Sequence, residues 1–447
     1  MFGAIMNVIY HNQEAPKRSG NLILLLVLYF FYSWALLSTY VVQLAEANAD
    51  KGWQPWAMSL EGWLVLGGGL PLVIWMTSRI DGRPSDFIRL FLGSITLVSF
   101  LVLHSVVGPL PEGAVLVCAA ILLTPLLLLE VVERLLPLMK NRLATCAARR
   151  IDLIIILIFL GSIFAAYLHA PASAGFGLDD SFVRRLEGRS IYMPSSLLAY
   201  ALAMSMNGFT PFLAFRAALK GDWLMLGLAA AADLFFFWLV GVKAPFAYLI
   251  AAYLLGHLIR QKMLARVALY FLCAVLMLWL LVLAEWWLFG KYSYIADYLF
   301  RRIFPVQALD QAYYLKFLFS DKAIPWSWLS GSFDPDFRVT YFIGENYGGN
   351  INSNSNTNAF LNALAAKGLI GYLGAVAFVV LVLVVFDRLW QSSRNPSYLF
   401  LGFLYGLLVI EQAYTVAMVS SGVGLLFLLV LFENPDDVGK PALVENI

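Results

Sequence analysis

Long runs of apolar residues, separated by short polar segments, make up most of this chain. Twelve runs approach or reach the roughly 20 residues that an α-helix needs to cross the hydrocarbon core of a bilayer. We therefore expect about 12 membrane-spanning helices, at positions 22–44, 62–78, 88–108, 112–133, 151–169, 192–215, 222–240, 244–259, 266–289, 358–386, 397–411 and 416–433. An even number of spans places both termini on the same side of the membrane.

The distribution of basic residues orients these spans. With a cytoplasmic N-terminus, the cytoplasmic segments hold 18 of the 30 Lys and Arg residues, as the positive-inside rule requires. Most of the external basic residues lie in two long loops, 170–191 and 290–357, and long loops cross the membrane largely regardless of charge. The first run follows Lys17 and Arg18 and is too long for a cleavable signal peptide. We predict a multi-pass protein with both termini cytoplasmic.

Composition supports this class of protein and excludes several others. The chain is 61% hydrophobic with a mean hydropathy of +0.78, which excludes an ordinary soluble enzyme. Its net charge of +2 argues against nucleic acid as a partner. Cys118 and Cys273 fall inside spans and Cys146 falls in a cytoplasmic loop, so we expect no external disulfide. The histidines are scattered, so we expect no metal site. We predict one all-α integral membrane domain over 1–447.

The external loop 290–357 has its own pattern. A loop of this length is usually functional or disordered, and its many Trp, Tyr and Phe residues argue against disorder. After Pro305, apolar residues recur every three to four positions, which predicts an amphipathic helix over 306–319 lying on the membrane surface. The residues that carry this pattern are Val306, Leu309, Tyr313 and Phe317.

A row of alternating asparagines ends this loop and leads directly into an apolar run. An amide side chain offers two donors and an acceptor, so the row can bind a hydroxyl-rich ligand or can cap and turn the backbone. A solvated turn before a helix is the plain alternative. The row consists of Asn350, Asn352, Asn354, Asn356 and Asn358.

Arginines on the external side are candidates for anion binding. Arg184 and Arg185 precede Arg189 by four to five residues, so the three can share a helix face. Guanidinium groups present a planar fork that matches phosphate oxygens. A salt-bridge network within the loop is the competing interpretation, because Asp179, Asp180 and Glu187 balance the charge.

A second candidate group lies late in the large loop. Arg338 is followed by the Gly-rich segment 344–349, whose backbone N–H groups could approach an anion. Glu345 lies in this segment and is our candidate general base, since base catalysis requires a carboxylate within hydrogen-bond reach of a substrate hydroxyl. The alternative is that Glu345 pairs with an Arg or caps a turn.

The second half of the chain resembles the Wzy family of bacterial O-antigen polymerases and, more distantly, the O-antigen ligases. The resemblance is carried by VRRLEGR, YSYIADYLFRRIF, DPDFR, NTNAFLNALAAKGLIGYLG and IEQAYTV with SSGVG. The spacing from Arg338 to Gly349 is similar to an Arg-and-Gly pattern of the family's periplasmic loops. Thr357 occupies the position at which the ligases carry a His, which favours polymerase over ligase.

This resemblance implies a GT-C-like membrane fold in the bacterial inner membrane, with the active site facing the periplasm. The donor would be a growing glycan on undecaprenyl pyrophosphate and the acceptor a new lipid-linked repeat unit, with inversion at the anomeric carbon and no metal or cofactor. Membrane lipids and a chain-length regulator are the other implied partners. The implied roles are catalysis by Glu345 and Arg338, pyrophosphate binding by Arg184, Arg185, Arg189, Arg301, Arg302 and Lys243, and sugar binding by Asn356, Asn358, Asn346, Tyr347 and Glu411.

Three other functions remain open from the sequence. A ligase would move the finished glycan to a different acceptor. A flippase or transporter should show a polar path that reaches both faces of the membrane, whereas the charged candidates gather on the external side. A membrane scaffold whose external loop binds partners would not need the dense set of Arg, Glu and Asn.

Overall fold

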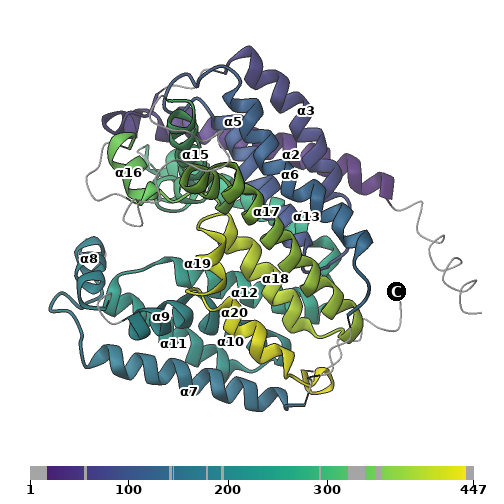
Figure 1. Ribbon diagram of the computed structural model, residues 1–447. Coiled ribbons are helices and arrows are strands. Elements are labelled where there is room, and N and C mark those ends of the chain that lie inside the picture. Colours follow the sequence, from purple (N-terminus) through teal and green to yellow (C-terminus); the bar gives the residue numbers. More distant parts are fainter. Residues whose placement is uncertain are drawn as a thin grey trace, which may run out of the picture.

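The computed structural model describes residues 18–54, 58–139, 143, 145–177, 180–192, 196–290, 293–320, 338–348 and 354–438. Over these residues the regular structure is helical, apart from one isolated bridge between Cys146 and Glu433. Figure 1 shows the helices packed side by side. The prediction of an all-α protein is confirmed for the described part of the chain.

Nine helical segments of the described chain are long and apolar enough to cross a membrane, which confirms a multi-pass membrane protein. Every backbone N–H and C=O inside the bilayer must be paired within the protein, and a helix achieves this by itself. The nine segments are built from α2 (Arg18–Thr39), α3 (Leu60–Thr77), α4 with α5 (Asp86–Leu90 and Ser99–Leu103), α6 (Ala114–Leu135), α7 (Ala148–Tyr167), α9 with α10 (Ser196–Met204 and Thr210–Lys220), α11 (Trp223–Val240), α13 (Val267–Phe289) and α17 (Ala359–Ser393).

The remaining three predicted spans are shorter in the structure. Two of them are the apolar helices α12 (Ala244–Arg260) and α18 (Pro396–Val409). The last, predicted over 416–433, is divided into α19 (Tyr414–Met418) and α20 (Val423–Leu431) because Gly422 adopts a left-handed conformation with φ of 83°. The nine residues of α20 extend about 14 Å, well short of a hydrocarbon core of roughly 30 Å. The number of twelve spans is therefore not confirmed.

The helices form two groups joined by the C-terminal part of the chain. In Figure 1, α2, α3, α5, α6, α13 and α15 lie in one half of the molecule, and α7 to α11 lie in the other. The helix α17 packs on α6 and α18, and α18 in turn packs on α4 and α12, so these two helices connect the halves. The two halves and the connecting helices share one continuous apolar core.

The segment from α4 to α5 lies at the centre of one half. Every residue from Asp86 to Leu103 is buried, so protein surrounds this span on all sides. A helix that is apolar all round is expected in such a position. Gly402 and Gly406 of α18 allow its backbone to pass close to Pro84 and Ile88. A Cβ at position 402 would collide with Pro84, and one at position 406 would make a tight contact with Ile88. These glycines place α18, and through it α17, against the central span.

The helix α17 is interrupted near its start. Gly368 has φ of 64° and ψ of −158°, a conformation that is open to glycine and strained for other residues. Most residues of the segment before this break are buried. The described end of the asparagine row, from Asn354 to Asn358, therefore leads into a short, mostly buried helix, and Asn350 and Asn352 lie outside the described residues.

The predicted helix over 306–319 exists as α15 (Pro305–Leu318), but its predicted position on the membrane surface is wrong. Most of its residues are buried, and it packs against α5, α6 and α17. Its polar residues find partners inside the protein: the Gln311 amide nitrogen donates to the Thr96 carbonyl oxygen at 3.3 Å. The apolar spacing correctly predicted a helix, while these internal polar contacts could not be read from it.

Candidate functional site

The end of the asparagine row is held in place by helix capping. The Asn358 side-chain oxygen accepts hydrogen bonds from the backbone N–H groups of Phe360 and Leu361 at 3.2 and 3.0 Å, and so caps the N-terminus of α17. Asn358 is completely buried, whereas Asn356 is exposed. Asn358 therefore has no surface to offer a sugar, and the predicted sugar contact is replaced by a capping role. Asn356 keeps its place as a sugar-binding prediction.

Ser355 connects this segment to three helices. Its backbone N–H donates to the Thr340 carbonyl oxygen at 3.0 Å in α16 (Val339–Asn346), and its hydroxyl donates to Asp310 at 2.5 Å in α15. Its carbonyl oxygen accepts from the Tyr314 hydroxyl at 3.2 Å, and the Asn362 amide of α17 donates to that same hydroxyl at 3.3 Å. A chain of hydrogen bonds thus runs from Asp310 to the start of α17.

Asp310 has the properties of a general base. Burial raises the pKa of the Asp310 carboxyl to about 7, and the hydrogen bond from Ser355 and the positive charge of Arg302 partly oppose this rise. A base works best when its pKa lies near the operating pH. Asp310 is not among the residues predicted from the sequence. The signal available in the sequence was a lone carboxylate within an apolar helical pattern, four residues before Tyr314.

The predicted phosphate-binding residues Arg301 and Arg302 lie in α14 (Arg301–Ile303), directly before α15. The Arg301 guanidinium forms an ion pair with Asp297 one turn earlier, so part of its charge is balanced within the protein. Arg302 is exposed and is close enough to Asp310 to lower the pKa of that carboxyl. The structure therefore places one predicted arginine beside the newly identified carboxylate.

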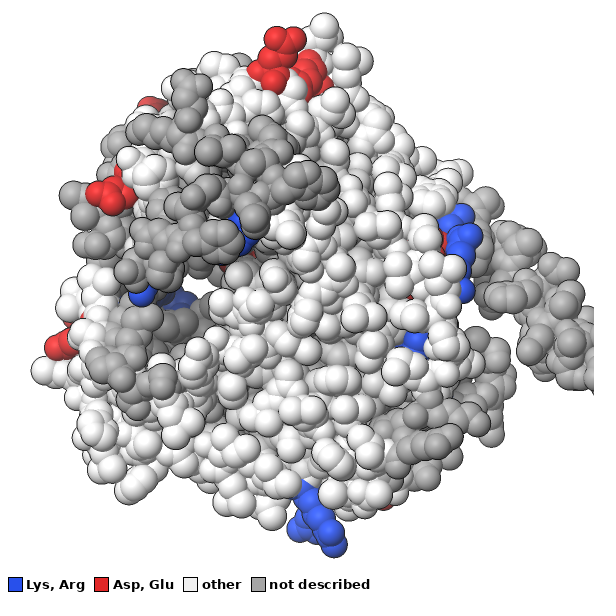
Figure 2. All heavy atoms as spheres, in the orientation of Figure 1, with Lys and Arg blue, Asp and Glu red and all other residues white. Residues whose placement is uncertain are grey.

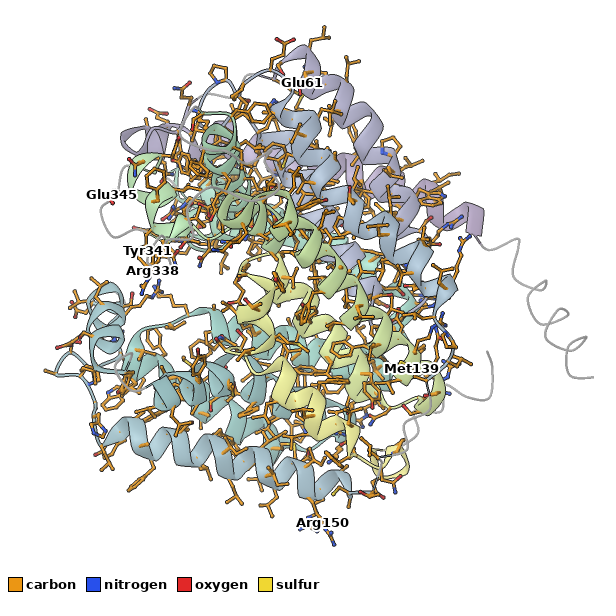
Figure 3. The ribbon with its side chains drawn as sticks, in the orientation of Figure 1. Glu61, Met139, Arg150, Arg338, Tyr341 and Glu345 are labelled. Atoms are coloured by element: carbon orange, nitrogen blue, oxygen red, sulfur yellow. The ribbon has the colours of Figure 1, made fainter. Side chains whose placement is uncertain are left out.

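Arg338 immediately precedes α16 and is exposed, with its guanidinium carbon 5.9 Å from the centre of the Tyr341 ring. Figure 2 shows a hollow on this face of the molecule with basic side chains at its edge. In the same orientation, Figure 3 shows Arg338 pointing toward this hollow and Glu345 pointing outward, away from it. Glu345 is exposed, and its role as the general base stays a prediction.

The other predicted residues of this region have structural contacts. The Asn346 amide donates to the Phe342 carbonyl oxygen at 2.9 Å within α16. The Tyr347 hydroxyl donates to Ser320 at 3.3 Å, and its ring packs edge-on against Phe317. These contacts fix α16 on α15. The sugar-binding roles of Asn346 and Tyr347 are not tested by this geometry.

The arginine cluster of the first external loop lies on α8 (Ser181–Tyr192). Arg184 is only 1% exposed, donates to the Gly177 carbonyl oxygen at 2.6 Å and lies 5.4 Å from the Phe237 ring. This arginine holds the loop against α11, and its burial leaves little surface for a phosphate. Arg185 is partly exposed, and the side chain of Arg189 lies outside the described residues. The Glu187 carboxylate accepts hydrogen bonds from the backbone N–H and the hydroxyl of Ser173.

The last two predicted residues lie near the same end of the molecule. The exposed ammonium group of Lys243 is 5.5 Å from the centre of the Tyr298 ring. Tyr298 lies about one helical turn before the Arg301–Arg302 pair. The Glu411 carboxylate accepts a hydrogen bond from the Tyr248 hydroxyl at 2.9 Å. Lys243 therefore approaches the arginine pair, whereas Glu411 is tied to α12.

One cavity of about 370 Å³ lies where α3, α5 and α6 approach the loops at this end, and its wall includes Glu61, His104 and Ser105. The carboxylate of Glu61 accepts backbone hydrogen bonds from Gly113 and Leu116 at the start of α6. Within the described part of the chain, no group of three or more His, Cys, Asp and Glu residues is arranged to hold a metal ion.

Together, these observations define an all-helical, multi-pass membrane protein with a cluster of polar and basic side chains at one end of its helices. Comparisons with protein-family models, with curated proteins and with solved structures found no match.

Proposed function

We propose that this protein is a membrane glycosyltransferase that polymerises lipid-linked oligosaccharide repeats, as O-antigen polymerases do. The observation that carries the proposal is the partly buried Asp310, whose pKa is raised to about 7 and which lies beside Arg302 and the capped start of α17. The proposal includes a GT-C-like fold of about 12 spans in a bacterial inner membrane, cytoplasmic termini and a periplasmic site.

The proposed reaction is a direct displacement at the anomeric carbon of the growing glycan. Asp310 takes the proton of an acceptor hydroxyl, and the hydroxyl oxygen forms the new bond from the face opposite to the leaving group. The bond between the anomeric carbon and the pyrophosphate oxygen breaks, and the electron pair leaves with undecaprenyl pyrophosphate. Arg302 and Arg338 stabilise the charge that develops on this leaving group, and the configuration is inverted.

Glu345 remains a second candidate for the base, because it is a carboxylate on the same helix as Thr340 and Tyr341. Asp310 is preferred because its pKa is suited to proton transfer near neutral pH. A flippase would need polar groups at both ends of the helices. Several buried charges at the opposite end are engaged in ion pairs, as in Arg216 with Glu433 and Arg89 with Asp86, which is typical of a structural network.

The proposal predicts how the polymerisation rate depends on pH. Asp310 must be deprotonated to act as a base, so the rate should rise with pH and level off above the pKa of about 7. For a single titrating base, the rate at pH 6 should be roughly tenfold below the plateau. The measurement is the initial rate of chain extension by the purified protein between pH 5 and pH 9. A flat profile over this range would contradict the role of Asp310.

Substitution of the basic residues tests whether they bind the pyrophosphate of the leaving group. Arg338→Ala should abolish long-chain polysaccharide in cells, while single repeats are still made. The variant should remain in the membrane, because Arg338 is exposed and its removal does not disturb the protein interior. Arg185→Ala should have the same effect. Arg184→Ala should instead lower the amount of folded protein, since Arg184 is buried and holds the loop at Gly177. The matched control is Arg150→Ala, an exposed arginine at the start of α7 (Figure 3).

The readout is the length distribution of the polysaccharide, together with the amount of each variant in the membrane fraction. Long chains in both Arg338→Ala and Arg185→Ala, at normal protein levels, would contradict pyrophosphate binding by these arginines.

A further inference from the structure

A cavity of about 240 Å³ lies between the last turns of α3 and α6, at the end of the molecule opposite to the candidate site. Trp75 and Arg79 form one side of it, and Glu130 and Arg134 form the other. These positions are at the ends of two membrane-spanning segments, where lipid headgroups meet a protein.

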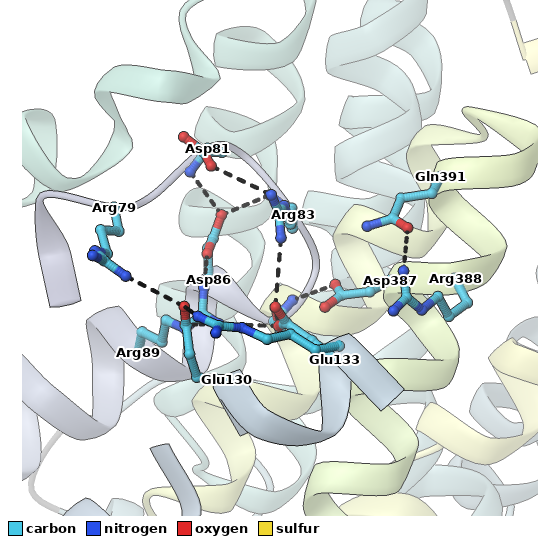
Figure 4. A network of polar contacts seen from close by, with 12 residues as sticks. Arg79, Asp81, Arg83, Asp86, Arg89, Glu130, Glu133, Asp387, Arg388 and Gln391 are labelled. Atoms are coloured by element: carbon cyan, nitrogen blue, oxygen red, sulfur yellow. Dashed lines mark hydrogen bonds and ion pairs between the residues drawn. The ribbon is translucent and has the colours of Figure 1, made fainter. Parts of the chain in front are cut away.

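The charges on the cavity wall do not cancel. Arg89 is buried and is balanced from the inside by Asp86 at 2.7 Å and Glu133 at 3.0 Å, in addition to its contact with Glu130 at 3.1 Å (Figure 4). On the open side, Arg79 and Arg134 lie 3.4 and 3.5 Å from the same oxygen of Glu130. Two exposed guanidinium groups thus share one carboxylate oxygen. The network is balanced as a whole, but three arginines and one glutamate line the cavity itself, because Asp86 and Glu133 lie behind Arg89.

The two guanidinium groups are accessible and one of them is held in position. The side chains of Arg79 and Arg134 are 45% and 74% exposed, so their remaining N–H donors are free to meet a ligand. The Trp75 ring lies 4.0 Å from the Arg79 guanidinium and orients it. A single phosphodiester at the opening would meet the basic lining of the cavity and accept hydrogen bonds from both groups.

The apolar part of the cavity wall indicates that the rest of the ligand is hydrocarbon. Leu127 and Val131 of α6 line it and are 45% and 53% exposed, so an apolar surface runs from the cavity along the lipid-facing side of the helix. A ligand that fills both parts has a phosphate at one end and hydrocarbon at the other. Basic pockets between membrane helices bind anionic headgroups in this way.

We propose that this cavity binds the headgroup phosphate of an anionic phospholipid, with its acyl chains along Leu127 and Val131. The assignment is independent of the proposed polymerase activity, because the cavity lies at the other end of the helices from Asp310. A soluble phosphate would gain nothing from the apolar wall.

The test is native mass spectrometry of the full-length protein, purified in detergent and titrated with phosphatidylglycerol or phosphatidylcholine. Wild-type protein should retain phosphatidylglycerol in preference to phosphatidylcholine. The double variant Arg79→Gln with Arg134→Gln should retain it roughly 30-fold more weakly, as expected for the loss of two basic groups near a phosphate. The matched control is Arg149→Gln with Arg150→Gln, two exposed arginines at the start of α7, which should behave like the wild type.

The lysine pair, Arg79→Lys with Arg134→Lys, keeps the charge and should keep most of the preference, so the proposal remains testable even if the glutamine pair folds poorly. Equal retention of phosphatidylglycerol by the wild type and the glutamine pair would overturn the proposal. An equal loss in the control pair would also overturn it, and so would a stronger arginine-dependent preference for a polyprenyl diphosphate than for phosphatidylglycerol.

Discussion

Asp310→Asn should reduce the rate of polymerisation at least 100-fold while leaving the protein folded. The asparagine amide has nearly the same shape and can still accept the hydrogen bond from Ser355, but it cannot take a proton from an acceptor hydroxyl. General-base catalysis contributes about 10² to 10⁴ in rate, so the expected loss lies in that range. The measurement is the rate of chain extension by purified protein, compared with the wild type at the same pH.

Ser355→Ala provides the control for this result. The Ser355 hydroxyl lowers the pKa of Asp310, so its removal should raise that pKa and move the rising part of the pH–rate profile to higher pH. The plateau rate should change far less than in Asp310→Asn. Full activity of Asp310→Asn would reassign Asp310 to a structural role and would return Glu345 to first place among the candidate bases.

Glu433→Ala should cause the largest loss of stability. Glu433 is completely buried and forms an ion pair with Arg216, which is also completely buried. Its second oxygen accepts hydrogen bonds from Asn395 at 2.9 Å and Ser397 at 2.7 Å, so it joins α10, the start of α18 and the end of α20. Its removal leaves the buried Arg216 with only the longer contact to Asp152 at 3.7 Å. Breaking a buried ion pair costs about 3–5 kcal/mol.

The measurement is thermal unfolding of the purified protein in detergent. Removing both charges with Arg216→Met and Glu433→Leu should recover much of the lost stability, because well-packed apolar residues can replace a buried ion pair. The exposed pair Arg149→Gln with Arg150→Gln should unfold at the wild-type temperature. An unchanged unfolding temperature in Glu433→Ala would show that this network is not needed for stability.

The sequence predicted the helices well because apolar runs of membrane length allow few other structures. It predicted α15 from the spacing of Leu309, Tyr313 and Phe317, but it placed this helix on the membrane surface. The burial of α15 depends on partners such as Thr96, more than 200 residues earlier in the chain, and apolar spacing carries no information about such partners. The break at Gly422 likewise depends on a backbone conformation that the apolar run 416–433 conceals.

The candidate site was predicted only in part. The asparagine row correctly marked the region where the loop enters α17, and capping was one of the roles that amides at this position could have. Asn358 takes that role, while Asn356 remains exposed. Asp310 was not predicted, because its hydrogen bond with Ser355 joins residues 45 positions apart that meet only in the folded protein. The burial of Arg184 could not be read from the charge pattern of its loop.

The most direct test of the proposed function uses the purified protein in lipid vesicles. The substrate is undecaprenyl-pyrophosphate repeat units from cells that make the polysaccharide but lack this protein, and the products are separated by size. We expect a ladder of glycans that differ by one repeat unit, formed by the wild type and not by Asp310→Asn. Transfer to a different acceptor without a ladder, or movement of the lipid across the vesicle membrane without any new glycosidic bond, would contradict it.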